Sequence, residues 1–295
     1  MGKILVTGAS GNIGKLTLEK LLARGVAPSE LIGLVRDPAK AAGLADLGIE
    51  LRKGDYLNPS SLDRVFKGVE KVMLVSAQAF TDRNKAHENV IDSAQRAAVK
   101  HLVYMPIIRR PGSGFDLPEV TQVDIYTERK IKESGLTFTF VEHPPFLESL
   151  PAYIGDAKAL ERGLRVPEGG GRVSFASRED LAEAHAVVLT EAGHERKTYK
   201  LSGPEAISFR EMASLLSTAL NKEVPLIGVS DAEYLKALIA NSLPEFLAKF
   251  LLGWMHGMAS GEWSDTSGDL ERLIRRKPKA ASEYLQEAYG RNSAR

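Results

Sequence analysis

Short apolar runs alternate with amphipathic segments through the first half of the chain. The apolar runs, which have the length of buried strands, lie at residues 4–6, 31–36, 49–52, 72–76, 102–105 and 136–141. The segments between them, among them residues 13–24, 83–99 and 125–133, carry apolar side chains at helical spacing. Because strands and helices alternate, we expect a parallel sheet with right-handed crossover helices, the α/β doubly wound Rossmann fold.

The second half of the chain mixes further short strands with helices. Strand-like runs lie at residues 172–175, 198–201 and 224–227, and helical periodicity covers residues 179–190, 209–220, 231–240 and 244–255. We interpret residues 1–145 as a Rossmann domain. Residues 146–295 are interpreted as a smaller C-terminal α/β lobe that serves the substrate and is interleaved with the first domain. The strands at 172–175, 198–201 and 224–227 are assigned to this second lobe.

The first strand runs directly into a turn with three glycines and then into an amphipathic helix. Gly8 permits the tight turn, Gly11 allows a pyrophosphate to approach the backbone, and Gly14 allows the helix to pack closely on the strand. The N-terminus of that helix then directs free N–H groups at the phosphates. This pattern predicts dinucleotide binding by Thr7, Gly8, Ala9, Ser10, Gly11, Asn12, Ile13 and Gly14.

The residue after the second strand indicates which dinucleotide binds. An acidic residue here would bond the ribose 2′-hydroxyl of NAD, whereas Arg36 offers a charge-assisted bond to the 2′-phosphate of NADP. Lys40 adds a second positive charge four residues later. The plainer alternative is a solvated arginine at a strand end. We predict NADP(H) as the cofactor, with Asp55 and Tyr56 after the third strand close to its adenine.

Loops at the carboxyl ends of the later strands are expected to complete the site, because open parallel sheets bind ligands at that edge. Small residues after the fourth strand suit a nicotinamide ribose, and the long loop at residues 106–123 is expected to shape a substrate site. The residues expected at this edge are Ser76, Ala77, Gln78 and Phe80 after the fourth strand, Met105 after the fifth, and Glu142, His143, Pro144, Pro145 and Phe146 after the sixth.

Composition narrows the possible functions. With 39 basic and 38 acidic residues the net charge is +1, so no whole-chain field attracts nucleic acid or an anionic membrane. The chain has no cysteine, which removes disulfides, thiolate nucleophiles and iron–sulfur ligation. No histidine has metal-ligand spacing, and the apolar stretch at residues 246–258 is too short and interrupted to span a membrane. We expect a cytoplasmic monomer or homodimer without a metal.

Two features are candidates for proton chemistry. Tyr126 and Lys130 share a helix face at the Tyr-x-x-x-Lys spacing by which dehydrogenases lower the pKa of a tyrosine and hold the nicotinamide ribose. The alternative is an ordinary surface pair, since Ser113 lies too far along its loop for a standard Ser-Tyr-Lys set. His143, at the edge of the sixth strand, is placed near the nicotinamide, and its alternative is a surface hydrogen-bonding histidine.

With these residues the chain resembles the atypical short-chain dehydrogenases of the NmrA-like group, in particular the triphenylmethane reductases and their NADPH:quinone oxidoreductase relatives. The resemblance spans nearly the whole chain. It is carried by residues 7–14, 34–40, 54–56, 127–128, 191–201 and 261–270. It implies a Rossmann domain that holds NADPH and a C-terminal lobe that closes over an aromatic substrate. In such relatives the cofactor meets the positions of residues 8–13, Arg36, 78–80 and 142–147.

The chain departs from these relatives at the substrate side, at Met105-Pro106, in the Glu142-His143 region and at Asp124, where relatives often carry His or Lys. Two function classes follow. The first is an NADPH-dependent oxidoreductase that delivers hydride to a quinone-like, enone or other conjugated acceptor, lodged between residues 106–115, 143–146 and 250–258. The second is a redox-sensing regulator that binds NADP(H) without turnover. The aromatic C-terminal lobe favours the first class, and Met105-Pro106 favours the second.

Overall fold

The computed structural model describes residues 2–290 and is built around a parallel sheet of seven strands. The strand order is β3-β2-β1-β4-β5-β6-β9, and each neighbouring pair is parallel. The strands are β1 (Lys3–Val6), β2 (Leu31–Val35), β3 (Glu50–Lys53), β4 (Val69–Leu74), β5 (His101–Tyr104), β6 (Phe138–Glu142) and β9 (Thr198–Lys200). The order reverses direction between β1 and β4, which is the point where open α/β sheets bind ligands.

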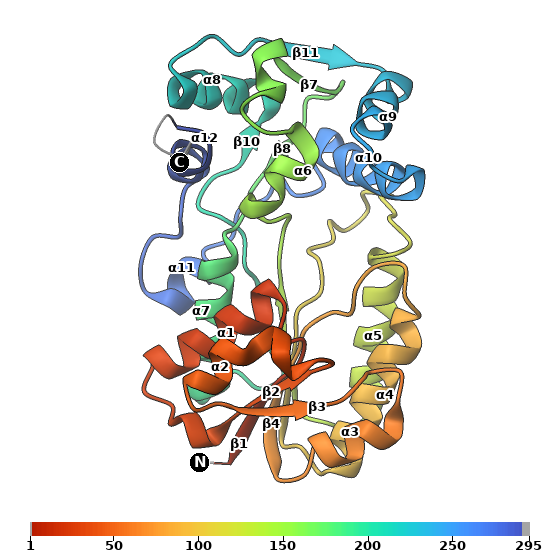
Figure 1. The fold of residues 1–295 in the computed structure, drawn as a ribbon, viewed down its shortest axis with the longest axis vertical. Coiled ribbons are helices and arrows are strands. Elements are labelled where there is room, and N and C mark those ends of the chain that lie inside the picture. The colour runs from red at the N-terminus through yellow and green to blue at the C-terminus, as the bar shows by residue number, and fades with distance from the viewer. Residues whose placement is uncertain (1, 291–295) are drawn as a thin grey trace.

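Helices cover both faces of this sheet (Figure 1). One face carries α1 (Asn12–Ala23), α7 (Arg178–Thr190) and α11 (Asp269–Ile274), and the other carries α3 (Pro59–Val65), α4 (Arg83–Arg96) and α5 (Thr121–Glu133). The short α2 (Ala42–Asp46) lies in the connection from β2 to β3. Side chains alternate along β1. Ile4 and Val6 enter the core between the sheet and α1 and α7, whereas Leu5 enters the core between the sheet and α3 and α4. The apolar run predicted as a central strand is therefore buried on both faces.

A second lobe with its own core sits above the carboxyl edge of the sheet, in the upper half of Figure 1. Two small sheets form there, one pairing β7 (Leu164–Pro167) with β11 (Leu226–Val229) and one pairing β8 (Arg172–Val173) with β10 (Ile207–Ser208). The helices of the lobe are α6 (Leu150–Ile154), α8 (Phe209–Leu220), α9 (Asp231–Ala240), α10 (Glu245–Ser260) and α12 (Ala281–Tyr289). Met212, Met255 and Trp263 are buried at its centre.

The assignment of residues 198–201 to the second lobe was wrong. This strand is β9, and it pairs with β6 in the central sheet, where Leu201 enters the core shared with α1. The helix before it, α7, packs on α1 rather than in the upper lobe. The chain thus returns to the Rossmann layer after its first excursion, a path that hydrophobic periodicity alone does not reveal.

The helix expected at residues 125–133 begins earlier, at Thr121. Its first turn is buried through polar side chains, because Thr121 and Asp124 face the interior and make hydrogen bonds there. A helical face made of polar residues has no apolar periodicity to detect. The sequence therefore placed the start of this helix four residues too late.

The helix–strand contact at Gly14 gives the first testable prediction. A Cβ atom at Gly14 would lie 2.4 Å from the carbonyl oxygen of Gly8 and 2.8 Å from its carbonyl carbon, both backbone atoms. We expect Gly14→Ala to lower the free energy of unfolding by about 2 kcal/mol or more, because the first turn of α1 must move away from the backbone of Gly8 and Ala9. Urea unfolding measures this. Gly43→Ala in α2 is the control, since nothing lies within 4 Å of its added methyl; an equal effect of both substitutions would contradict the packing argument.

Candidate active site

A cleft of about 220 Å³ opens at the switch point between β1 and β4. Of the residues predicted to bind the cofactor, those that line it are Gly8, Ser10, Gly11, Arg36, Asp55, Tyr56, Ser76, Ala77 and Gln78. Further lining residues, which the sequence analysis did not predict to bind the cofactor, are Leu34, Val35, Gly54, Leu57, Val75, Thr81 and Ala86. The cleft thus receives the turns after β1, β2, β3 and β4, as a dinucleotide site in this fold requires.

The floor of the cleft is the N-terminus of α1. No side chain caps this helix, its N-cap residue is Gly11, and its first turn contains no acidic residue. The N–H groups at a helix N-terminus need an acceptor, and the helix dipole favours an anion there. Gly8, with a φ of 59°, makes the turn that exposes this end. The structure therefore presents an open anion site where a pyrophosphate is expected.

Three hydrogen bonds fix the loop after β4 against the cleft. The backbone N–H of Val75 donates to Thr7 Oγ1 at 2.9 Å, and Tyr56 OH donates to the Val75 carbonyl at 3.1 Å. The N–H of Ala77 donates to Nε2 of the buried His87 at 2.9 Å, so the proton of the neutral ring is on Nδ1, beside Thr127. Burial lowers the pKa of His87 to about 3, which keeps this acceptor available at neutral pH.

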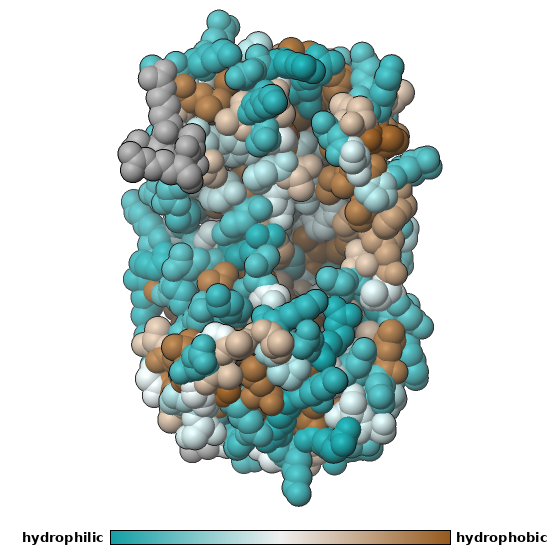
Figure 2. Space-filling model, in the orientation of Figure 1, coloured by the Kyte–Doolittle hydropathy of each residue, from teal (hydrophilic) through white to brown (hydrophobic). Residues whose placement is uncertain are grey.

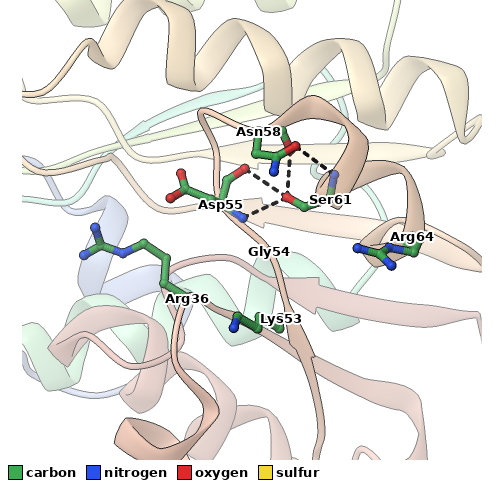
Figure 3. Close-up of a pocket in the computed structure, with 7 residues that line it drawn as sticks. All are labelled: Arg36, Lys53, Gly54, Asp55, Asn58, Ser61 and Arg64. Carbon is green, nitrogen blue, oxygen red and sulfur yellow. Dashed lines mark hydrogen bonds between the residues drawn. The ribbon is translucent and has the colours of Figure 1, made fainter.

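Basic side chains line a pocket that adjoins the cleft at Arg36 (Figure 3). Arg36, Lys53 and Arg64 line an adjoining open pocket with Asp55. Within residues 2–290 none of these three cations forms an ion pair with a carboxylate at 4.0 Å or less. The Asp55 N–H donates to Ser61 Oγ at 3.0 Å, which holds the turn after β3. A phosphate group on the ribose would meet unpaired positive charge here.

A second cavity, of about 330 Å³, continues from the cleft into the space under the upper lobe. The two share Val75, Ser76 and Ala77 as lining residues. Figure 2 shows a hollow between the two halves of the molecule with hydrophobic residues inside it. The walls are mostly apolar or aromatic: Ile13, Ala79, Met105, Ile107, Val120, His143, Pro145, Phe146, Tyr153, Phe250 and Trp254. Each of the three segments predicted to enclose a substrate contributes to this wall.

An aromatic contact joins the loop after β4 to the upper lobe at Phe250, which lines the cavity. Phe80, which follows β4, meets Phe246 and Phe250 of α10 edge-on, with ring centroids 4.9 and 5.1 Å apart. Phe80 has a φ of 64°, a conformation that is uncommon for an aromatic residue. The residue was predicted to bind the cofactor, but it lines neither the cleft nor the cavity and instead contacts the other lobe.

The cavity also contains one buried charged network. Arg83 at the start of α4 and Asp124 in the first turn of α5 both line it, with 6% and 2% of their surface exposed. One Asp124 oxygen accepts from Tyr104 OH at 2.6 Å and lies 3.5 Å from Arg83 Nη2, and the other accepts from the Ile107 N–H at 2.7 Å. Burial raises the pKa of Asp124, an effect that the Arg83 charge opposes.

His143 is the one candidate proton-transfer residue from the sequence that lines the cavity. Its ring stacks on Phe146 with centroids 4.6 Å apart, and its Nδ1 lies 2.9 Å from the Pro144 carbonyl oxygen. A carbonyl can only accept, so Nδ1 carries the proton and Nε2 is left as an acceptor. Burial lowers the pKa of His143 to about 4, so at neutral pH it is a neutral wall residue rather than an acid.

Tyr126 and Lys130 share a face of α5, as their spacing predicted, but they line neither the cleft nor the cavity. Lys130 is held by Glu88 of α4 at 2.9 Å, and its Nζ lies 5.6 Å from the centroid of the Tyr126 ring. Ser113 is exposed in its loop, where its Oγ accepts from the Phe115 N–H. The structure does not bring a Ser-Tyr-Lys set to the cavity.

Several other predicted cofactor residues line neither space. Thr7 and Ala9 are buried supports of the glycine turn, and Gly14 packs on Gly8. Asn12 and Lys40 are exposed, Glu142 is half-buried and Pro144 is buried, and none of the four lines the cleft or the cavity. Arg83 and Asp124 were not predicted as site residues, because a buried ion pair between two helix starts leaves no local signal. Asp124 was noted only as a departure from relatives.

Glu142 gives a prediction about pH. Burial, together with the nearby Glu128, raises the pKa of its carboxyl from 4.5 to about 7. Since the folded state holds this proton more tightly than the unfolded chain does, the contribution to stability is present below pH 4.5 and is lost as the pH rises to about 7. We expect Glu142→Gln to raise the free energy of unfolding at pH 8 by about 2 kcal/mol and to have little effect at pH 4.

Denaturant unfolding at both pH values tests this expectation. Glu50→Gln is a control of opposite sign, because hydrogen bonds from Arg52 and Lys3 lower the pKa of Glu50 to about 2. That substitution should be destabilising at pH 8. If Glu142→Gln is less stable than the wild type at pH 8, the charged carboxylate stabilises the folded state, and the prediction that burial destabilises this charge is wrong.

Comparison with known proteins agrees with this geometry. The model of the family described as NAD(P)H-binding matches residues 8–192. The chain belongs to the NAD(P)H-binding family. Quinone oxidoreductase 2 of Escherichia coli is 33% identical over 292 residues, which cover 98% of this chain and 100% of that protein. The NAD(P)H azoreductase of Xenophilus azovorans is 33% identical over 250 residues, 83% of each chain.

The solved structures agree as well. The triphenylmethane reductase of Citrobacter sp., in complex with NADP(H), superposes with a TM-score of 0.90 and 32% identity over 97% of this chain and 100% of that one. The expectations of a Rossmann-type fold, of NADP(H) as cofactor and of an oxidoreductase related to the NmrA-like proteins are confirmed. Within residues 2–290, no helix is long and apolar enough to cross a membrane, and no cluster of three metal-ligating side chains occurs.

Proposed function

We propose that this protein transfers hydride from NADPH, bound in the cleft, to a planar conjugated acceptor bound in the adjoining cavity. The observation that carries the proposal is the junction of the two spaces at Val75, Ser76 and Ala77. A cofactor that follows the cleft from Arg36 past Gly11 arrives at that junction with its nicotinamide end. The reduced nicotinamide supplies the hydride, and an acceptor on the other side of the junction would lie against it.

The chain's own residues bind the cofactor, orient the acceptor and exclude water from the acceptor. The free N–H groups at the start of α1 hold the pyrophosphate, and Arg36 with Lys53 holds the 2′-phosphate. Thr7 and His87 fix the loop that separates cleft from cavity. Phe146, Phe250 and Trp254 provide apolar surface for a flat acceptor and displace water from it.

The class of acceptor is inferred from the side chains that line the cavity. No Ser-Tyr-Lys set reaches it, so a simple ketone would find no standard proton donor. A quinone, enone or extended dye accepts hydride with less help, because its conjugated system spreads the incoming charge and water can complete the protonation. The relatives named as quinone oxidoreductase, azoreductase and triphenylmethane reductase support acceptors of this kind.

NADPH oxidation at 340 nm tests the proposal. Quinones, aromatic enones, azo dyes and triarylmethane dyes are compared with simple ketones, and NADPH binding is measured separately by its fluorescence. We expect at least one conjugated acceptor class to accelerate oxidation and simple ketones to do so far less. If NADPH binds and no acceptor accelerates its oxidation, the second function class, a redox-sensing regulator without turnover, replaces this proposal. Met105 does not favour the regulator class in the structure. It forms part of the apolar wall of the cavity and leaves about 330 Å³ in which an acceptor can bind.

A further inference from the structure

The unusual feature of this cavity is a buried arginine in a wall that is otherwise mostly apolar. Arg83 is 94% buried, since 6% of its surface is exposed, and it lines the cavity. Its Nη1 donates to the Glu119 carbonyl, and its Nη2 lies 3.5 Å from Asp124 Oδ1. Its Nε has no hydrogen-bond partner among the described residues. A guanidinium has five N–H donors, and among the described residues Nη1 and Nη2 have one acceptor each and Nε has none, so this side chain retains unused donor capacity although it is 94% buried.

An unused donor in a buried site has a measurable cost. Leaving a charged donor without an acceptor forfeits the hydrogen bond that water would have supplied. A ligand in the cavity that carries an oxygen atom offers an acceptor to the N–H groups of the guanidinium that have none, whereas a ligand made only of carbon and cationic nitrogen does not. The cavity is therefore selective for chemistry as well as for shape.

We propose that the guanidinium of Arg83 binds the carbonyl oxygen of the acceptor and stabilises the negative charge that develops on it during hydride transfer. This rests on the proposed function and narrows its substrate class to conjugated carbonyl compounds, quinones and enones before cationic dyes. Asp124 is a positioning residue in this account. Its Oδ1 lies 3.5 Å from Nη2 of Arg83, and its carboxylate is itself held by Tyr104 OH and the Ile107 N–H.

The step balances without any further reactant. The acceptor gains a C–H bond at a carbon conjugated to its carbonyl, formed with both electrons of the C4–H bond that breaks in the reduced nicotinamide. The π electrons of the acceptor move onto the carbonyl oxygen beside Arg83, and that oxygen then takes one proton from water. NADPH is oxidised, and the acceptor is reduced by two electrons. A donor fixed in advance where charge develops is among the stronger catalytic devices of enzymes.

Arg83→Met tests the assignment, with menadione as the carbonyl acceptor and malachite green as a cationic acceptor without oxygen. We expect kcat/KM for menadione to fall about 100-fold, in the range seen when an oxyanion donor is removed, and for the dye to change less than about threefold. Arg83→Lys, which keeps the charge, should recover part of the menadione activity. Arg129→Met, the same substitution on the exposed face of α5, is the matched control and should leave both activities unchanged.

A binding measurement keeps the test independent of turnover. Trp254 lines the cavity, so quenching of its fluorescence reports acceptor binding to the NADP⁺ complex. We expect Arg83→Met to weaken menadione binding about tenfold and malachite green binding little. Equal losses for both ligands, or no loss for menadione, would overturn the assignment. If the wild type reduces no acceptor, the proposed function fails while this difference in binding still decides the role of Arg83.

Discussion

Gly11→Val is expected to abolish NADPH binding and to leave the protein folded. Gly11 is exposed at the N-cap of α1 with a φ of −91°, which a residue with a side chain adopts readily. A Cβ atom added there meets only the carbonyl oxygen of Gly8, at 3.2 Å. The isopropyl group instead fills the space in front of the helix N-terminus, where the pyrophosphate must come close to the backbone. Affinity should fall by about 1000-fold, because the phosphates lose several charge-assisted hydrogen bonds together.

The measurement pairs circular dichroism with titration of NADPH fluorescence. Gly170→Val, at a position with nothing within 4 Å of the added atom, is the matched control and should bind NADPH as the wild type does. Gly14→Ala separates the two roles of the turn, because it disturbs the packing of α1 on the backbone of Gly8 and Ala9. A folded Gly11→Val protein with normal NADPH affinity would show that the pyrophosphate does not pass this turn.

Arg36→Asp is expected to reverse the cofactor preference. Arg36 lines the cleft beside Asp55 and has no carboxylate partner among the described residues, so its charge is available to a 2′-phosphate. The substitution removes a charge-assisted hydrogen bond and adds a repulsion, while an aspartate accepts a bond from the 2′-hydroxyl of NADH. We expect the ratio of NADPH to NADH affinity to fall by about 100-fold or more, which corresponds to roughly 3 kcal/mol.

Titration calorimetry with both cofactors measures this ratio. Lys53→Gln should lower it by a smaller factor, because Lys53 adds charge at the side of the same pocket. Lys40→Gln is the control: Lys40 was predicted to assist Arg36, but it lines neither pocket at this end of the cleft. An unaltered ratio in Arg36→Asp would remove the argument for NADPH from this residue.

The parts of the site that could be predicted are those encoded locally. The glycine turn could be predicted because the spacing of Gly8, Gly11 and Gly14 depends only on one strand, one turn and one helix that are adjacent in sequence. Arg36 could be read in the same way, from its distance along the chain to that turn. The expected preference for NADPH rested on Arg36, with Lys40 as a second positive charge, and the structure instead places Lys53 and Arg64 with Arg36 around one pocket.

The parts that could not be predicted depend on contacts between distant segments. The pairing of β9 with β6 requires the chain to leave the sheet for the upper lobe and then return. The short sequence of β9 does not indicate which strand it pairs with. Arg83 and Asp124 lie 41 residues apart in sequence and look like ordinary surface charges at two helix starts. The Tyr126–Lys130 spacing, by contrast, is a local pattern that any amphipathic helix can carry, and here it lies on a surface shared with Glu88.

Deuterium transfer tests the central claim most directly. NADPH labelled with deuterium at C4 is incubated with the protein and an aromatic enone such as benzylideneacetone, and the product is analysed by mass spectrometry. Hydride transfer across the junction of cleft and cavity predicts one non-exchangeable deuterium per product molecule, on the carbon β to the carbonyl, from one of the two faces of C4 only. A reduced enone or triarylmethane dye without deuterium at its acceptor carbon, or bound NADPH that transfers hydride to no acceptor, would contradict the account.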